Sequence, residues 1–145
     1  MYNRYTIDNT IFKIAIYIRL SREDGDDMES ESVTNQRSLL NGYLKAQNLV
    51  AVDIYIDDGY TGTNFERPDF KRMLNDIEKG KINMVITKDL SRLGRNYLQS
   101  GAYIEMYFPQ KNIRYIAITD GIDTLNSNQN DIMPFKNILN EMYAK

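Results

Sequence analysis

The sequence contains no cysteine and no histidine among its 145 residues. Their absence excludes disulfide bonds, a thiol nucleophile, an imidazole general base and most kinds of zinc site. Any catalysis must therefore use hydroxyl groups, carboxylates, lysines and arginines. A nucleophilic serine would have to act without the usual histidine partner.

The sequence also lacks a long apolar run and a large net charge. No stretch is long enough to cross a bilayer, and the polar first ten residues do not read as a secretory leader, so we expect a cytoplasmic protein without a membrane partner. With 18 basic and 20 acidic residues the net charge is −2, which offers nucleic acid no overall attraction. Any phosphate site must be local. The length and the 42% hydrophobic content suit one ordinary domain.

Short apolar runs rich in β-branched residues alternate with amphipathic segments. The runs predict strands at residues 12–20, 50–56, 82–87 and 113–119. The amphipathic segments predict helices at residues 33–48, 69–79 and 97–110, and a last helix from about residue 132. This alternation predicts an α/β fold, a three-layer, mostly parallel sheet with helices on both faces. Residues 121–131 are expected to form a mobile loop.

Two helix boundaries carry local signals. Pro68 stands in the first turn of the helix predicted at 69–79, and Gly80 follows its end. Asn96 followed three residues later by Gln99 is typical of a capping box at the start of the next helix.

Ligands of open parallel sheets bind at the carboxyl ends of the strands, so the residues that follow each predicted strand are candidates for function. There the sequence carries the hydroxyl group of Ser21 and four arginines, namely Arg19, Arg67, Arg92 and Arg95. Residues 79–95 hold five basic side chains against one acidic side chain, Asp89. This excess of positive charge predicts a local anion site.

Arginines in such a cluster suit a phosphate group. A guanidinium stays charged and donates hydrogen bonds in a planar fork that matches phosphate oxygens. Preorganised arginines can stabilise the charge that a phosphodiester gains under attack, with Ser21 as the nucleophile. Loss of the serine proton can be explained in two ways. Either a carboxylate takes the proton, or the surrounding arginines lower the pKa of the serine hydroxyl.

Each of these residues also has an ordinary structural interpretation. A single arginine or serine near a strand end is most often a surface residue or a helix cap. Asp57 and Asp58 at a strand end could be metal ligands, but they could equally form the turn that leads into Gly59.

Three separated motifs, in order, resemble the catalytic domain of the serine recombinases, the resolvase/invertase family. They are Tyr17-Ile-Arg19-Leu-Ser21, the run Asp58-Gly-Tyr-Thr-Gly62 leading to Glu66-Arg67-Pro68, and Lys88-Asp-Leu-Ser91-Arg92-Leu-Gly94-Arg95-Asn96, with Gln36 in the helix after the first motif. The acidic segment 23–31 and the form of the third motif resemble the large serine recombinases of phages and mobile transposons.

The resemblance implies a site-specific DNA recombinase in which Ser21 forms a 5′-phosphoserine intermediate, before strand exchange and religation. It implies Arg19, Arg67, Arg92 and Arg95 as phosphate-binding catalytic residues, joined by Lys88 in binding DNA. Supporting positions are Tyr17, Gln36, Asp58, Glu66 and Ser91. Ser91 stands where small resolvases usually carry an aspartate, so no acid or base role is carried over to it, and Asp89 cannot be assumed to replace it.

The resemblance also implies a domain organisation and partners. Residues 1–131 would form the resolvase-type N-terminal catalytic domain, and residues 132–145 would begin a long oligomerisation helix, with the C-terminal DNA-binding domains absent from this chain. The implied partners are double-stranded DNA carrying recombination sites and further copies of the chain, in a dimer and a synaptic tetramer. No cofactor and no metal ion is implied.

Two other function classes stay open. A receiver-type α/β regulatory module would use a strand-end aspartate, Asp57 or Asp58, together with Lys88 and Mg²⁺. A metal-dependent nuclease or topoisomerase-like domain would need a carboxylate triad near a strand end, for which Asp120 and Asp123 are the best candidates.

Overall fold

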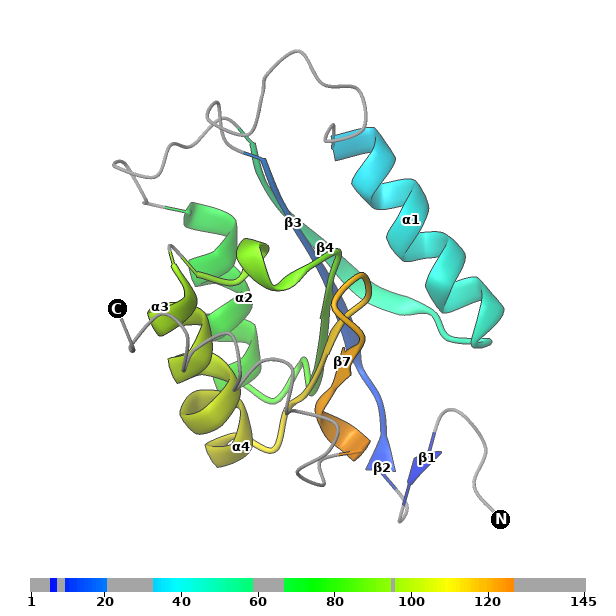
Figure 1. Cartoon of the computed structure of the whole chain (residues 1–145). Coiled ribbons are helices and arrows are strands. Elements are labelled where there is room, and N and C mark those ends of the chain that lie inside the picture. Colours follow the sequence, from blue (N-terminus) through cyan, green and yellow to red (C-terminus); the bar gives the residue numbers. More distant parts are fainter. Residues whose placement is uncertain (1–5, 8–9, 21–32, 59–66, 95, 127–145) are drawn as a thin grey trace.

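A five-stranded sheet forms the centre of the molecule (Figure 1). The structure is a computed structural model that describes residues 6–7, 10–20, 33–58, 67–94 and 96–126. In the strand order β4-β3-β5-β6-β7, neighbouring strands are parallel except that β7 runs antiparallel to β6. The strands are β3 (Ile14–Leu20), β4 (Ala51–Asp58), β5 (Met84–Thr87), β6 (Arg114–Ala117) and β7 (Ile122–Asp123).

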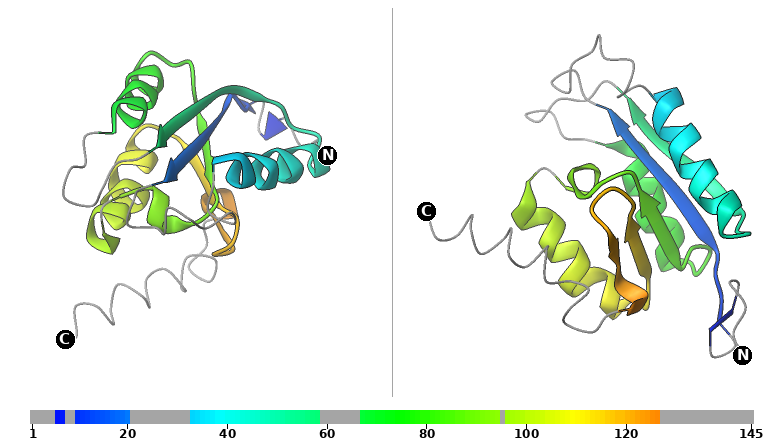
Figure 2. Two further views of the ribbon diagram at one scale, coloured as in Figure 1. Left: turned by 90° about the horizontal axis from the view of Figure 1, so that it is seen from above. Right: turned by 45° about the vertical axis from the view of Figure 1, so that its right-hand side comes forward.

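Helices cover both faces of the sheet, as Figure 2 shows, so the predicted three-layer α/β fold is confirmed. On one face, Ile14, Ile16 and Ile18 of β3 pack with Leu40 and Leu44 of α1 (Val33–Ala46). On the other, Ala15 and Tyr17 of β3 share a core with residues of α2 (Pro68–Glu78) and α4 (Phe108–Gln110), and α3 (Tyr97–Ala102) lies on the same side. The alternation of side chains along β3 feeds both cores, which explains its continuous apolar run.

The four predicted strands exist, with bounds shifted by one to two residues at most ends. The structure adds three elements of two residues each that periodicity cannot detect, namely β7 and the hairpin of β1 (Thr6–Ile7) and β2 (Thr10–Ile11). The prediction of a loop at residues 121–131 is wrong for its first part, because β7 and the 3₁₀ turn η5 (Thr124–Asn126) lie there.

The helix predicted at 97–110 is not a regular α-helix. A π turn, η4 (Tyr103–Tyr107), separates α3 from α4. Pro109 has no N–H to donate to residue 105, and its ring crowds that carbonyl group, so a wider turn relieves the conflict. Tyr103 in this turn packs edge-on against Phe70 of α2, with ring centroids 5.2 Å apart.

The local boundary signals agree with the structure. Pro68 is the first residue of α2, and Gly80 after its end has a φ of 78°. The side chain of Asn96 accepts a 2.9 Å hydrogen bond from the backbone N–H of Gln99 at the start of α3. Within the described part of the chain, no helix is long and apolar enough to cross a membrane. The helix expected from about residue 132 lies outside the described residues.

Candidate active site

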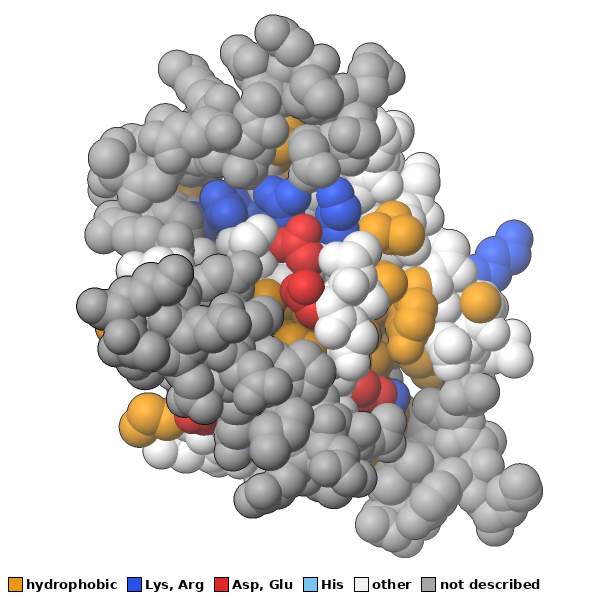
Figure 3. All heavy atoms as spheres, in the orientation of Figure 1, with side chains coloured by type: hydrophobic (Ala, Val, Ile, Leu, Met, Phe, Trp, Pro, Cys, Tyr) orange, Lys and Arg blue, Asp and Glu red, His pale blue; other side chains and the backbone are white. Residues whose placement is uncertain are grey.

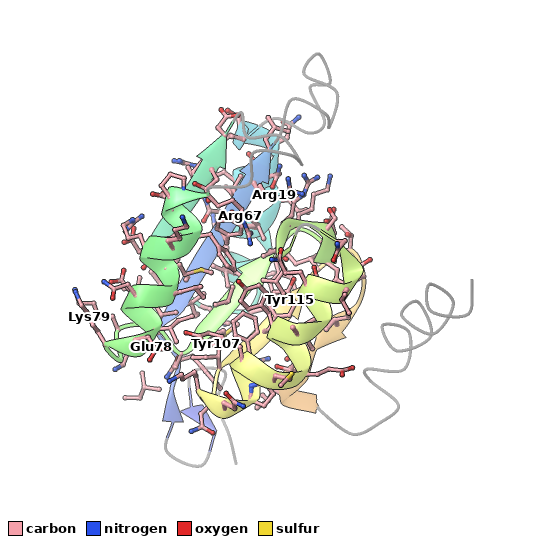
Figure 4. The ribbon with its side chains drawn as sticks, turned by 90° about the vertical axis from the view of Figure 1, so that its left-hand side faces the viewer. Arg19, Arg67, Glu78, Lys79, Tyr107 and Tyr115 are labelled. Carbon is pink, nitrogen blue, oxygen red and sulfur yellow. The ribbon has the colours of Figure 1, made fainter. Side chains whose placement is uncertain are left out.

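Three buried arginines meet at the carboxyl ends of the parallel strands. Arg19 is the next-to-last residue of β3, Arg67 directly precedes α2, and Arg92 lies in the 3₁₀ turn η3 (Leu90–Arg92) after β5. Their exposed fractions are 8%, 3% and 4%. Figure 4 shows Arg19 and Arg67 at the same end of the sheet, and in Figure 3 basic side chains lie side by side next to acidic ones.

Each guanidinium is held by a backbone carbonyl of another segment of this cluster. Arg19 Nη2 donates to the carbonyl of Ser91 at 2.7 Å, and Arg92 Nη1 donates to the carbonyl of Arg19 at 3.0 Å. Arg67 Nη1 donates to the carbonyl of Arg92 at 3.3 Å. A buried charge must be hydrogen-bonded to be tolerated. The backbone carbonyls supply these hydrogen bonds and, being uncharged, leave the positive charge of the guanidinium in place. The three arginines therefore form one preorganised cationic cluster, called here the arginine cluster.

The backbone of Arg67 is unusual. Its φ of 45° and ψ of 68° are left-handed, a conformation that costs about 1–3 kcal/mol for a residue other than glycine. Because Pro68 disfavours a helical conformation in the residue before it, α2 cannot extend backward to include Arg67. Its guanidinium carbon lies 3.7 Å from the ring centroid of Phe70, a cation–π contact. Tertiary contacts thus hold this side chain toward the site against a local backbone preference.

Asp57 lies next to the arginine cluster and is 1% exposed. Its Oδ1 accepts the backbone N–H of Asp69 at 2.9 Å, and its Oδ2 accepts that of Phe70 at 2.9 Å. Oδ2 also accepts the hydroxyl of Tyr17 at 2.8 Å, and that hydroxyl accepts a 3.4 Å bond from Arg67. Of the alternatives for Asp57, neither a metal ligand nor a turn former describes it, since it anchors the N-terminus of α2.

Asp89 is a residue that the sequence argument did not include among the site residues. Its Oδ1 accepts the backbone N–H of Ser91 at 3.0 Å and the hydroxyl of Ser91 at 2.6 Å. The same oxygen lies 3.5 Å from Arg92 Nε. The available signal was an aspartate just before a short helical turn, which is an N-cap pattern. Asp89 thereby places a carboxylate against the arginine cluster, although the third motif has serine at position 91.

The supporting positions differ in where the structure places them. Gln36 of α1 is buried, and its Nε2 donates to the carbonyl of Arg19 at 3.1 Å. Ser91 is exposed in η3, and Lys88, half-buried, directly follows β5. Asp58 is exposed at the end of β4. Ser21, Glu66 and Arg95 lie outside the described residues, although Ser21 directly follows Leu20, the last residue of β3.

The basic run 79–95 does not gather into one anion site. Lys79 and Lys81 precede β5, whereas Lys88 and Arg92 follow it, so the strand separates the two groups. Figure 4 shows Lys79 at the end of the molecule opposite Arg19 and Arg67. Counting charges along the chain failed here because a strand of four residues spans roughly 13 Å.

Three of the four acidic residues named for the two other function classes, Asp57, Asp120 and Asp123, are engaged in structural contacts. Asp120 Oδ2 accepts the backbone N–H of Leu90 at 2.7 Å, and Asp123 forms an ion pair with Arg114 at 2.8 Å. The burial and three hydrogen bonds of Asp57 leave it poorly placed to accept a phosphoryl group. In the ranges that the structure describes, no three acidic side chains are grouped so as to hold a metal ion.

Gly94 makes close contact with the helix that follows the arginine cluster. A Cβ at this position would lie 2.8 Å from the backbone nitrogen of Ser100. We expect Gly94→Ala to displace the segment that carries Arg92 and to lower the free energy of unfolding by about 1–3 kcal/mol. Urea unfolding measures the effect.

Gly42 of α1 provides the matched control for Gly94→Ala, because a Cβ there meets nothing within 4 Å. Gly42→Ala is expected to raise the free energy of unfolding by roughly 0.5–1 kcal/mol through its helix propensity. Equal stability of the Gly94→Ala and Gly42→Ala proteins would contradict the packing argument.

Two buried tyrosines predict how stability depends on alkaline pH. Burial raises the pKa of Tyr17, with Asp57 adding to the rise and Arg67 opposing it, and burial likewise raises the pKa of Tyr115. A pKa that is higher in the folded chain contributes stability below the unfolded value of about 10, and this stability is lost as pH rises above that value. We expect Tyr17 and Tyr115 to ionise only when the chain unfolds. Phenolate absorbance measures the ionisation, and circular dichroism measures the unfolding. Reversible ionisation of all 11 tyrosines in a folded protein would contradict this.

A family model and several curated proteins match the sequence. The family described as "Resolvase, N terminal domain" matches residues 14–145. A putative DNA recombinase of Bacillus subtilis (strain 168) is 32% identical over 105 residues, which are 72% of this chain and 20% of the relative. An uncharacterized immunity region protein 3 of Bacillus phage phi105 is 33% identical over 73 residues, 50% of this chain and 88% of the relative. The chain thus spans about a fifth of the Bacillus subtilis relative.

Solved structures with the same fold are recombinases. The N-terminal catalytic domain of TP901-1 integrase superposes with a TM-score of 0.73 at 28% identity, covering 91% of this chain and 96% of that domain. A resolvase family site-specific recombinase from Streptococcus pneumoniae gives a TM-score of 0.69 at 24% identity, covering 92% and 89% of the two chains. The second likeness concerns the fold alone.

Proposed function

Because the chain belongs to the resolvase family of serine recombinases, we propose that this site-specific DNA recombinase domain cuts DNA by attack of Ser21 on a phosphodiester. One observation carries the proposal. Arg19, Arg67 and Arg92 converge, buried and mutually hydrogen-bonded, at the strand end that residue 21 directly follows.

The reaction exchanges one phosphoester bond for another. The Ser21 hydroxyl gives up its proton as its oxygen bonds to phosphorus, the bond from phosphorus to the 3′ oxygen breaks, and that oxygen takes up a proton to become a free 3′ hydroxyl. The 5′ phosphate stays on the serine, and no net proton is gained or lost. Since the bond from serine to phosphorus replaces the bond that was broken, the 3′ hydroxyl of an exchanged strand can attack the phosphorus, release the serine and rejoin DNA without ATP.

The arginine cluster would bind the phosphate and stabilise the charge that develops on its oxygens. The cluster carries three positive charges against one carboxylate beside it, Asp89, and a second, Asp57, that is linked to Arg67 through the Tyr17 hydroxyl, so its local charge suits an anion. We assign Arg95 to the same role from its motif position, and Lys88 to the DNA backbone. Tyr17 and Gln36 are positioning residues, because one bonds Arg67 and the other the carbonyl of Arg19. Asp58, Glu66 and Ser91 keep their supporting assignment from the motifs.

The proposal extends to organisation. Residues 1–131 form the catalytic domain and residues 132–145 begin a helix that mediates a dimer and a synaptic tetramer. Double-stranded DNA with recombination sites is the substrate, and site choice lies in C-terminal DNA-binding domains. The length of the Bacillus subtilis relative, about five times the matched part, supports further domains in that protein.

Mass spectrometry tests the chemistry. The full-length protein is mixed with a duplex carrying its recombination site in EDTA, quenched under denaturing conditions and digested. We expect a nucleotide adduct on the peptide that contains Ser21, and none with a duplex lacking the site. Cut DNA without any protein adduct would overturn the phosphoserine mechanism.

A further inference from the structure

The strand β4 lies at one edge of the five-stranded sheet, next to β3. The outward N–H and C=O groups of an edge strand form a template on which another strand can pair. In a protein that folds around such a sheet, an open edge of eight residues invites pairing between copies. The side chains near this edge show how the chain treats it.

Side chains occupy the outward backbone groups of β4. The backbone N–H of Ile54 donates to Asp53 Oδ1 at 2.7 Å, and that of Ile56 donates to Asp69 Oδ2 at 2.8 Å. The carbonyl of Ile54 accepts a 3.3 Å hydrogen bond from Arg72 Nη2. Because these bonds use three backbone groups of the edge, a new strand would have to displace them first.

The three side chains also hold one another, and we call Asp53, Asp69 and Arg72 the Arg72 cluster. Arg72 forms ion pairs with Asp53 at 2.9 Å and with Asp69 at 3.4 Å. Its guanidinium carbon lies 4.1 Å from the ring centroid of Tyr55. These contacts hold the guanidinium of Arg72 against the strand edge. Without them, the side chain would extend into solvent.

A register shift adds a second barrier at the start of β4. Ile14 pairs with Ala51 and Ala15 pairs with Asp53, so Val52 is an extra residue in the edge strand. Such a bulge bends an edge strand and spoils its template. The regular part of the edge begins after it, where the Arg72 cluster lies.

The exposed backbone pattern identifies the strand that would fit. In an antiparallel pair of two β4 strands centred on Tyr55, Ile54 of each copy would exchange both backbone hydrogen bonds with Ile56 of the second copy. Asp53 would then face Asp57 of the second copy, so its charge opposes the pairing too. We propose that the Arg72 cluster closes β4 against pairing with a second copy of this chain, and that removing the cluster makes this edge a self-pairing interface.

Sedimentation equilibrium and hydrogen exchange test the proposal on this chain with Asp53→Thr, Asp69→Ala and Arg72→Ala combined. We expect association at least tenfold tighter than that of the wild type. The amides of Ile54 and Ile56 should be protected at high protein concentration and unprotected at low concentration. A double variant of exposed residues, Arg37→Ala with Glu105→Ala, serves as the control and should associate as the wild type does.

A folded triple variant that associates no more tightly than the wild type would overturn the proposal. Tighter association without protection at Ile54 and Ile56 would overturn it equally. If circular dichroism shows that the triple variant does not fold, Arg72→Ala alone is measured in the same way and the same outcomes decide. No DNA is involved, so the result is independent of the recombinase chemistry.

Discussion

Full-length protein carrying Ser21→Ala is expected to leave DNA uncut and to form no covalent adduct. The chain has no cysteine or histidine that could take over the attack, and an alanine has no oxygen to bond to phosphorus. Removing the nucleophile of a serine enzyme costs on the order of 10⁶-fold in rate. Gel analysis of a radiolabelled duplex under denaturing conditions measures the loss.

Ser38→Ala is the matched control for Ser21→Ala, because Ser38 is an exposed serine on α1. It should cut DNA at the wild-type rate. Both variants should give the wild-type circular dichroism spectrum and bind the duplex with wild-type affinity. Cleavage by the Ser21→Ala protein at a rate near the wild type would refute the assignment of the nucleophile.

Arg92→Lys is expected to lower the cleavage rate by about 10²–10³-fold, the cost of removing one preorganised donor to a developing oxyanion. The substitution keeps a positive charge, but a lysine is a single point donor and cannot reach several oxygens in a planar fork. Arg92 also donates to the carbonyl of Arg19 at 3.0 Å, so the change loosens the arginine cluster as well. Single-turnover cleavage separates this loss of rate from a loss of DNA binding.

Arg37→Lys, an exposed change on α1, is the control for Arg92→Lys and should leave the rate unchanged. The argument requires the Arg92→Lys protein to fold, which a urea unfolding curve establishes. If a folded Arg92→Lys protein cleaves as fast as the Arg37→Lys protein, the geometry of the guanidinium is irrelevant and only its charge matters. That outcome would contradict the role proposed for the arginine cluster.

Periodicity predicted the layered fold because each long element satisfies its own repeat. The alternation along β3 and the helical spacing of Phe70, Met73 and Ile77 are properties of neighbouring residues. Elements without a repeat escaped prediction, as β7 did with its two residues. The π turn at Tyr103–Tyr107 escaped because it depends on Pro109 and on packing against α2.

The candidate site was predicted in part for a different reason. Motif order and the rule that ligands bind at strand ends pointed to Arg19, Arg67 and Arg92, which the fold brings together. Counting charges along the chain failed for Lys79 and Lys81, since closeness along the chain is not closeness in space when a strand intervenes. It also passed over Asp89, whose importance comes from where its carboxylate points.

The sequence by itself limited the class of chemistry, because the absence of a residue type excludes its reactions whatever the fold. Without cysteine and histidine, a thiol nucleophile and an imidazole general base are excluded. Tertiary structure alone decided how the arginines are held, since the bond from Arg19 to Ser91 joins residues 72 positions apart. It also decided that Asp57 anchors a helix and that Arg72 occupies an edge of the sheet. Such bonds depend on strand order and register, which no local pattern encodes.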